Sequence, residues 1–205
     1  MRLLALFVAL AVFTFAPIAM AIEEAPFSVV ESQDRFELRQ YQPYAVAETV
    51  VDGTFETAGN EGFRRLVRYI GGANRGKREI SMTAPVEQTK EGEKIAMTAP
   101  VEQTGVDGQW RIGFVLPAGY TAENAPVPDD ARIELRTVPG RLMASVRYSG
   151  RWTRANYDEN LAALRTWVSQ QGWTVEGEPV WARYNPPMLP WFLRRNEILL
   201  PVKRP

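Results

Sequence analysis

Apolar residues recur at intervals of three and four positions in two stretches of the chain, which is the spacing of one face of an α-helix. The first stripe consists of Phe63, Leu66, Val67 and Ile70. The second consists of Tyr157, Leu161, Leu164 and Val168. Gly72 and Gly172 follow the two stripes, and glycine is a typical helix terminator. The pattern predicts two amphipathic helices, and Asn156 with Glu159 resembles a capping box at the start of the second.

Shorter apolar runs, some of them alternating with polar residues, are typical of β-strands. They cover residues 45–51, 111–116, 142–148, 179–184 and 197–202. Between them, residues 118–130 contain Gly119, Pro126 and Pro128, which predicts a loop. Residues 185–190 include three prolines, and we expect a rigid loop without helix there.

A short repeat lies in the middle of the chain. Residues 80–89 recur with a single substitution as residues 95–104, at a shift of 15 positions. Pro85 and Pro100 exclude both copies from being central strands throughout. We expect the Ile–Met portion of each copy to end a strand and the Thr-Ala-Pro-Val portion to be irregular.

A weaker and longer repeat relates the two halves of the chain. Residues 37–39 and 134–136 have the same sequence at a shift of 97 positions, and Gly53 matches Gly150 at that shift. Each half then contains strand, strand, helix and further strand in the same order. We therefore predict a duplicated α+β domain, with halves of about 27–109 and 110–205 and one helix packed on the sheet of each half.

The first 21 residues have the pattern of a secretory signal peptide. Arg2 precedes an uncharged run of about 14 residues, and residues 19–21 form a small-x-small cleavage site. We predict cleavage after Ala21, a single mature domain over 22–205, and export to a bacterial periplasm. An uncleaved N-terminal anchor is the alternative, although the run is short for a bilayer span.

The composition narrows the chemistry. The 205 residues include no His and no Cys, so a Ser-His-Asp triad, a Cys nucleophile, an ordinary zinc site and covalent c-type haem attachment are excluded. Lys and Arg number 24, as do Asp and Glu, and this zero net charge argues against a nucleic-acid partner. Acid–base chemistry by carboxylates stays open.

Several segments occur together, in a fixed order, in one known family. They are residues 69–74, 94–101, 114–117, 126–128, 148–150, 184–188 and 194–197. The chain thus resembles the SOUL haem-binding protein family from about residue 27 to 202, and the doubled Met-Thr-Ala-Pro-Val resembles its bacterial branch. The resemblance implies a compact α/β barrel of two pseudo-symmetric halves, each with a helix on a curved antiparallel sheet.

The same resemblance implies non-covalent binding of haem or a related tetrapyrrole. Because the chain has no His, only the family's mode without a His ligand is open: a shallow apolar groove beside the first helix. It maps to Phe63 and Val67 on that helix and to the loop with Tyr184, Met188 and Leu189. Arg64 would pair with a propionate, and Met97 or Tyr184 are the candidate iron ligands. No dedicated metal site is expected.

Each of these residues also has a structural interpretation. The helix stripe is more typical of a core face than of a groove, and Met97 more often fills a gap in a core. Tyr184 can pack under the loop, and Arg64 can belong to a solvated face. Residues 194–197 suggest a structural ion pair. Residues 187–193 are either a buried loop or an exposed apolar lip.

Three functions remain open. The first is a non-enzymatic carrier, buffer or scavenger of a tetrapyrrole or another flat apolar ligand. The second is an enzyme that uses a buried carboxylate as acid or base, for which a raised pKa inside a pocket is the signature. The candidates for that carboxylate are Glu87, Glu102, Glu178 and Glu197. The third is an envelope protein that binds a partner and has a vestigial pocket.

Overall fold

The computed structural model describes residues 23–76, 92–106 and 108–205. The predicted signal peptide and the first copy of the short repeat, with Met82 and Glu87, lie outside these residues. Two helices, α1 (Phe55–Ile70) and α2 (Arg154–Gln170), pack on a ten-stranded sheet. Neither helix is long and apolar enough to cross a membrane. The chain is therefore an α+β protein, as the hydrophobic pattern predicts.

Every strand pairing in the sheet is antiparallel. Its strands are β1 (Phe27–Gln33), β2 (Phe36–Tyr41), β3 (Tyr44–Asp52), β5 (Val101–Val106), β6 (Gln109–Val115), β8 (Ile133–Val138), β9 (Leu142–Tyr148), β10 (Thr174–Val175), β11 (Val180–Arg183) and β12 (Asn196–Lys203). A separate two-stranded sheet joins β4 (Asn74–Arg75) to β7 (Val127–Pro128). Only β7 lies inside residues 118–130, which the sequence predicts to be a loop.

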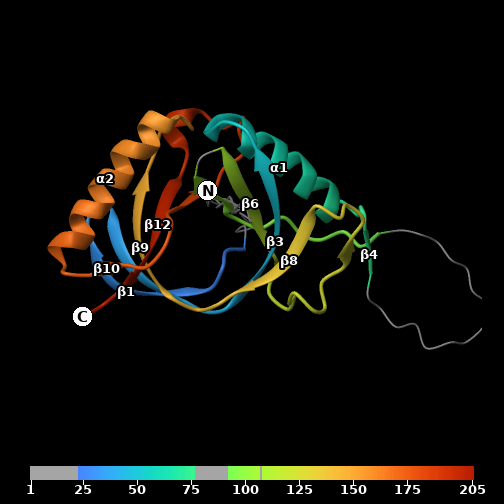
Figure 1. The fold of residues 1–205 in the computed structure, drawn as a ribbon, viewed down its shortest axis with the longest axis horizontal. Coiled ribbons are helices and arrows are strands. Elements are labelled where there is room, and N and C mark those ends of the chain that lie inside the picture. The colour runs from blue at the N-terminus through green and yellow to red at the C-terminus, as the bar shows by residue number, and fades with distance from the viewer. Residues whose placement is uncertain (1–22, 77–91, 107) are drawn as a thin grey trace, which may run out of the picture.

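The strand order is β1-β2-β9-β12-β11-β5-β6-β3-β8, and β10 pairs with the end of β12. In the described residues β1 pairs only with β2, and β8 pairs only with β3. The sheet thus has two free ends, and the predicted barrel is not a closed one. Figure 1 shows the strongly curved sheet with both helices along its outside.

The alternation of side chains along each strand gives the sheet two buried faces. The face under the helices holds the main core, with Leu38, Ala47, Ile112, Ala144 and Ile198 all fully buried. The opposite face carries a second apolar cluster, which includes Val46, Met143, Ala182, Tyr184 and Leu199. Polar and charged side chains share that second face, and the residues of interest below come from it and from the loops.

Both helices begin with a threonine cap. Thr54 caps α1 and accepts a hydrogen bond from the Thr57 amide. Thr153 caps α2 and accepts from the Asn156 amide, so the predicted capping box that starts at Asn156 is wrong. Asn156 instead lies in the first turn, because the helix starts two residues earlier.

The second copy of the short repeat is less regular than predicted. Residues 92–98 form no strand, so the Ile–Met portion of this copy does not end one. Ile95 is nevertheless buried, and its amide donates to the carbonyl oxygen of Ile70 at 2.9 Å. The segment therefore packs against the C-terminal end of α1, and regular pairing begins only with Val101.

Candidate functional site

The predicted helix residues lie on α1 as the periodicity places them. Phe63 and Val67 are half-buried against the main core, and the Phe63 ring meets Phe114 edge-on at a centroid distance of 5.4 Å. Arg64 is exposed on the outer side of the helix and makes no ion pair within the described parts of the chain. Most of the apolar stripe of α1 thus belongs to the core, and only its edge reaches solvent.

Met97 is half exposed, at 49% of its surface, in the segment that follows α1. It does not fill a gap in the core, and about half of its surface faces solvent. The neighbouring Ile95 anchors the segment at the C-terminal end of α1.

Tyr184 lies on the opposite face of the sheet from α1. Its hydroxyl donates to Glu197 at 2.9 Å, and the Arg195 guanidinium stacks 3.7 Å from the centre of its ring. Burial raises the pKa of Tyr184 well above its usual value. A tyrosine ligand to iron binds as the phenolate, so this buried and already bonded hydroxyl does not suit that role.

Residues 187–193 form an exposed segment rather than a buried loop. Met188 is 83% exposed, and Trp191, Phe192 and Leu193 in the 3-10 turn η1 (Trp191–Leu193) are 47%, 58% and 60% exposed. We call these four side chains the apolar lip. The partly buried Leu189 lies between them in sequence.

The backbone under the apolar lip is held firmly. Arg194 donates to the carbonyl oxygens of Leu189 at 2.8 Å and Pro187 at 2.6 Å. Its guanidinium also stacks 4.3 Å from the ring of Trp152. The Gly150 amide donates to the carbonyl oxygen of Trp191 at 3.0 Å. The lip therefore presents apolar side chains from a fixed support.

Glu197 is the centre of a buried ion-pair network, as predicted for residues 194–197. Its carboxylate accepts from Arg39 at 2.6 Å and from Arg195 at 2.9 Å, and it has no exposed surface. Burial alone would raise the pKa of Glu197, but the hydrogen bonds and charges of the two arginines hold it below its usual value. Glu197 is thus a structural group that is ionised at neutral pH.

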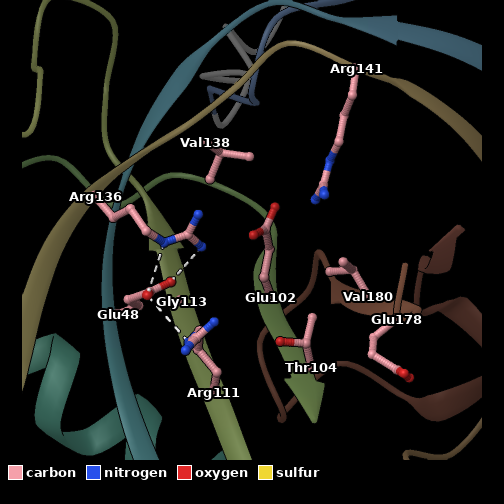
Figure 2. A pocket seen from close by; sticks show the side chains of 10 residues that line it. All are labelled: Glu48, Glu102, Thr104, Arg111, Gly113, Arg136, Val138, Arg141, Glu178 and Val180. Atoms are coloured by element: carbon pink, nitrogen blue, oxygen red, sulfur yellow. Dashed lines mark hydrogen bonds and ion pairs between the residues drawn. The ribbon is translucent and has the colours of Figure 1, made fainter. Parts of the chain in front are cut away.

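A polar pocket of about 220 Å³ opens on the same face of the sheet. It is lined by Glu48, Glu102, Thr104, Arg111, Gly113, Arg136, Val138, Arg141, Glu178 and Val180, which Figure 2 shows. Glu48 accepts from Arg136 at 2.8 and 3.0 Å and pairs with Arg111 at 3.3 Å. The Tyr44 hydroxyl donates to Glu102 at 3.0 Å. Two of the ten lining residues, Glu102 and Glu178, are among the carboxylates that the sequence suggests as acid–base candidates.

The four candidate acids differ in their surroundings. Glu87 lies outside the described residues, and Glu178 is exposed at the pocket mouth. Glu197 has a lowered pKa and is ion-paired. Burial raises the pKa of Glu102, although the Tyr44 hydroxyl and Arg141 oppose the shift. Glu102 is therefore the candidate that combines a pocket with a raised pKa.

Residues 22–201 match the family model described as SOUL heme-binding protein. The chain belongs to the SOUL heme-binding protein family. SOUL membership covers almost the whole described fold, including α1, the pocket and the apolar lip. The assignment to a bacterial branch stays a prediction.

Known SOUL relatives are distant. Heme-binding protein 1 of Xenopus laevis is 29% identical over 164 residues, which are 80% of this chain and 81% of that protein. Heme-binding protein 1 of Mus musculus is 26% identical over 152 residues, or 74% of this chain and 75% of the mouse protein.

Solved structures share the fold at lower identity. The C-terminal domain of EcmrR superposes with a TM-score of 0.53 at 14% identity, covering 83% of this chain and 98% of that one. EcmrR in a DNA complex gives a TM-score of 0.60 at 12% identity, covering 83% of this chain and 57% of the other. A hydrolase from Listeria innocua gives 0.53 at 11% identity, with 85% and 94% covered. These similarities concern the fold alone.

The side chains of this SOUL protein offer few possible ligands for haem iron. The described residues contain no group of three or more His, Cys, Asp or Glu that could hold a metal ion, and the sequence has no His or Cys. Met97 and Met188 are exposed residues, and the methionine thioether is an accepted haem-iron ligand. The residues therefore fit a flat ligand held by apolar contact, with a methionine as the candidate iron ligand.

Proposed function

We propose that this protein binds haem or another tetrapyrrole non-covalently on the apolar lip and serves as an exported carrier, buffer or scavenger. The observation that carries the proposal is the exposure of Met188, Trp191, Phe192 and Leu193 on one short segment of a SOUL-family chain. An exposed apolar patch of this kind is typical of a binding surface. Because these side chains are exposed, residues 187–193 are not a buried loop.

Burial of the macrocycle supplies the affinity in this proposal, at about 25 cal/mol per Å² of apolar area. Trp191 and Phe192 meet edge-on at a centroid distance of 5.5 Å and offer aromatic surface for stacking. Arg151 lies 5.6 Å from the centre of the Trp191 ring, and its N–H groups suit a carboxylate. Arg151 therefore takes one propionate. Bound haem would supply iron chemistry, and the protein holds and orients it.

Phe192→Ser tests the lip directly. We expect the variant to weaken haemin binding on the order of ten-fold, because it removes a large exposed apolar contact. The measurement is a titration followed by Soret absorbance. Val175→Ser is the matched control, because Val175 is 42% exposed on β10 and lies outside the lip. Equal affinities for the two variants would place the haem elsewhere.

The iron ligand is tested by Met188→Ala and Met97→Ala in the same titration. If Met188 is the residue that would hold the iron, only its variant changes the position of the Soret band, because only that variant removes the sulfur ligand. The reverse result would move the site to the end of α1.

The helix residues Phe63, Val67 and Arg64 remain part of this proposal. Val67→Asp adds a charge at the solvent edge of the stripe, and Arg64→Gln removes a possible propionate partner. A loss of haemin affinity in either variant would extend the site from the lip to α1. Unchanged affinity in both would confine it to the lip.

Export is a further part of the proposal, supported by the charge and apolar pattern of residues 1–21. We expect the protein purified from the periplasm of a bacterial host to begin at Ile22. Intact mass spectrometry measures this directly. A product that retains residue 1 and stays with the membrane fraction would favour the uncleaved anchor.

We also propose that the two halves arose by duplication, for which the strand pairing provides support. Leu38 on β2 pairs with Ala144 on β9, and Leu135 on β8 pairs with Ala47 on β3. A shift of 97 positions converts one pair into the other. The strand order from β2 to β8 is also symmetric about its centre. Exchanging β2 with β8, β9 with β3, β12 with β6 and β11 with β5 gives the same order in reverse.

The enzymatic alternative has one supporting residue, Glu102. Its raised pKa and its place in a polar pocket are features of acid–base groups. They are equally features of carboxylates that bind a polar ligand. Turnover that depends on Glu102 would favour the enzyme, and it is assayed by comparing the wild type with Glu102→Gln on any compound found to bind the pocket.

A further inference from the structure

The polar pocket is separate from the proposed tetrapyrrole surface, because none of the apolar lip residues lines it. Its volume of about 220 Å³ is below the roughly 300–1,000 Å³ of sites for drug-sized ligands. Three of its lining residues are arginines and three are glutamates. Size and lining both point to a small and polar occupant rather than to a macrocycle.

One wall of the pocket is electrostatically satisfied. Arg136 holds Glu48 through two parallel hydrogen bonds, and Arg111 pairs with the same carboxylate at 3.3 Å. Glu48 is buried, whereas both arginines reach solvent. This group of three adds one positive charge to the pocket and leaves no carboxylate oxygen of Glu48 without a partner.

The other side of the pocket is open. Glu102, on β5, points into the cavity, and Arg141, just before β9, points toward it from the opposite side (Figure 2). Glu102 and Arg141 form no ion pair and no hydrogen bond with each other. Glu102 accepts from the Tyr44 hydroxyl, and burial raises its pKa. Thr104 lies below Glu102, and Glu178 also lines the cavity, with its carboxylate turned away from Glu102 (Figure 2).

We propose that this pocket binds a small amino acid as a zwitterion. Its ammonium group contacts Glu102 and Thr104, and its carboxylate contacts Arg141. The placement of opposite charges on facing walls, without a direct ion pair between them, is what a zwitterion satisfies at both ends. Arginine binds carboxylates through two N–H groups, which fixes the orientation of the ligand.

Ligands with a single charge fit less well. A simple amine is repelled by the three arginines of the cavity, because Glu48 neutralises only one of their three positive charges. A simple carboxylate meets Glu102 and Glu178. Specificity of this kind comes from the group that repels the wrong ligand as much as from the group that attracts the right one.

Isothermal titration calorimetry of the purified protein tests this assignment. The probes are glycine, γ-aminobutyrate and 6-aminohexanoate, which differ in the spacing of the two charges, with butylamine and butyrate as single-charge references. We expect at least one amino acid to bind saturably, and both references to bind at least ten-fold more weakly. No saturable binding of any amino acid, or equal binding of either reference, would overturn the proposal.

Two variants locate the site. Glu102→Gln and Arg141→Gln should each weaken the best amino acid at least ten-fold, whereas Glu134→Gln and Arg147→Gln serve as exposed charge controls outside the pocket lining. Arg141→Lys keeps the positive charge and should therefore bind the amino acid more tightly than Arg141→Gln. This comparison keeps the test valid if Arg141→Gln folds poorly. Wild-type affinity in both Gln variants would place the binding elsewhere.

A haemin titration of Glu102→Gln separates this site from the proposed function. Unchanged haemin binding together with lost amino-acid binding is the expected result. Loss of both would show that the two ligands share one site and would overturn the assignment of a second one.

Discussion

At the scale of single residues, two carboxylates on the same sheet face have opposite surroundings. Glu197 is fully enclosed and bonded to Arg39, Arg195 and Tyr184. Glu102 is bonded only to Tyr44 among the described residues and faces a cavity. The first carboxylate stabilises the fold in its charged form, and the second is costly to ionise until a ligand approaches it.

Removal of the first carboxylate should be strongly destabilising. We expect Glu197→Gln to lower the free energy of unfolding by about 3–5 kcal/mol, because the buried Arg39 keeps only the partly exposed Glu37 as a counter-charge. Urea unfolding at pH 7 measures it. Asp158→Asn, which removes an exposed ion pair with Arg154 on α2, should change the free energy by less than about 1 kcal/mol. Similar losses in the two variants would contradict this account.

The two carboxylates also predict opposite pH dependence. The lowered pKa of Glu197 contributes stability above its unfolded-state pKa, which is lost as the pH falls through its folded-state pKa. The raised pKa of Glu102 does the reverse, so its contribution is lost as the pH rises through the folded-state pKa.

Glu102→Gln should therefore be more stable than the wild type at pH 7, and the difference should vanish below about pH 4, where Glu102 is protonated in both states. Thermal unfolding at the two pH values measures the difference. A variant less stable than the wild type at pH 7 would show that ionised Glu102 is well compensated.

At the scale of elements, the close contact between α1 and β6 depends on Gly62. A Cβ atom added at Gly62 would collide with the side chain of Ile112 on β6. We expect Gly62→Ala to lower the free energy of unfolding by about 1–3 kcal/mol, because the helix must move away from a packed core. Asn60→Ala on the exposed side of α1 should be neutral or slightly stabilising. Chemical unfolding of both variants decides the matter.

The elements themselves were largely predictable. Residues 142–148 form the strand expected from their alternation, and both helices follow their apolar stripes. The start of α1 was not predicted, because Phe55 precedes the stripe and is recognised only through the cap at Thr54. Residues 95–97 have a strand-like sequence, but they pack on the end of α1 and form no ladder.

At the scale of the whole molecule, the pocket could not be predicted from local pattern. Glu48, Glu102 and Arg141 come from distant parts of the chain and meet only through the strand order. Alternation on β3 and β8 does place Glu48 and Arg136 on one face, but it gives no sign that a cavity lies there. The sequence leaves residues 187–193 open between a buried loop and an exposed lip, and only the exposure of these side chains in the structure shows that they face solvent.

The most direct test of the central claim is a fluorescence titration of the wild-type protein with haemin and with metal-free protoporphyrin. The six tryptophans include Trp191 on the lip, so quenching reports on the proposed surface. Because apolar burial carries the affinity, we predict that both ligands saturate at one equivalent with affinities of the same order. Linear, non-saturating quenching by both ligands would contradict tetrapyrrole binding by this protein.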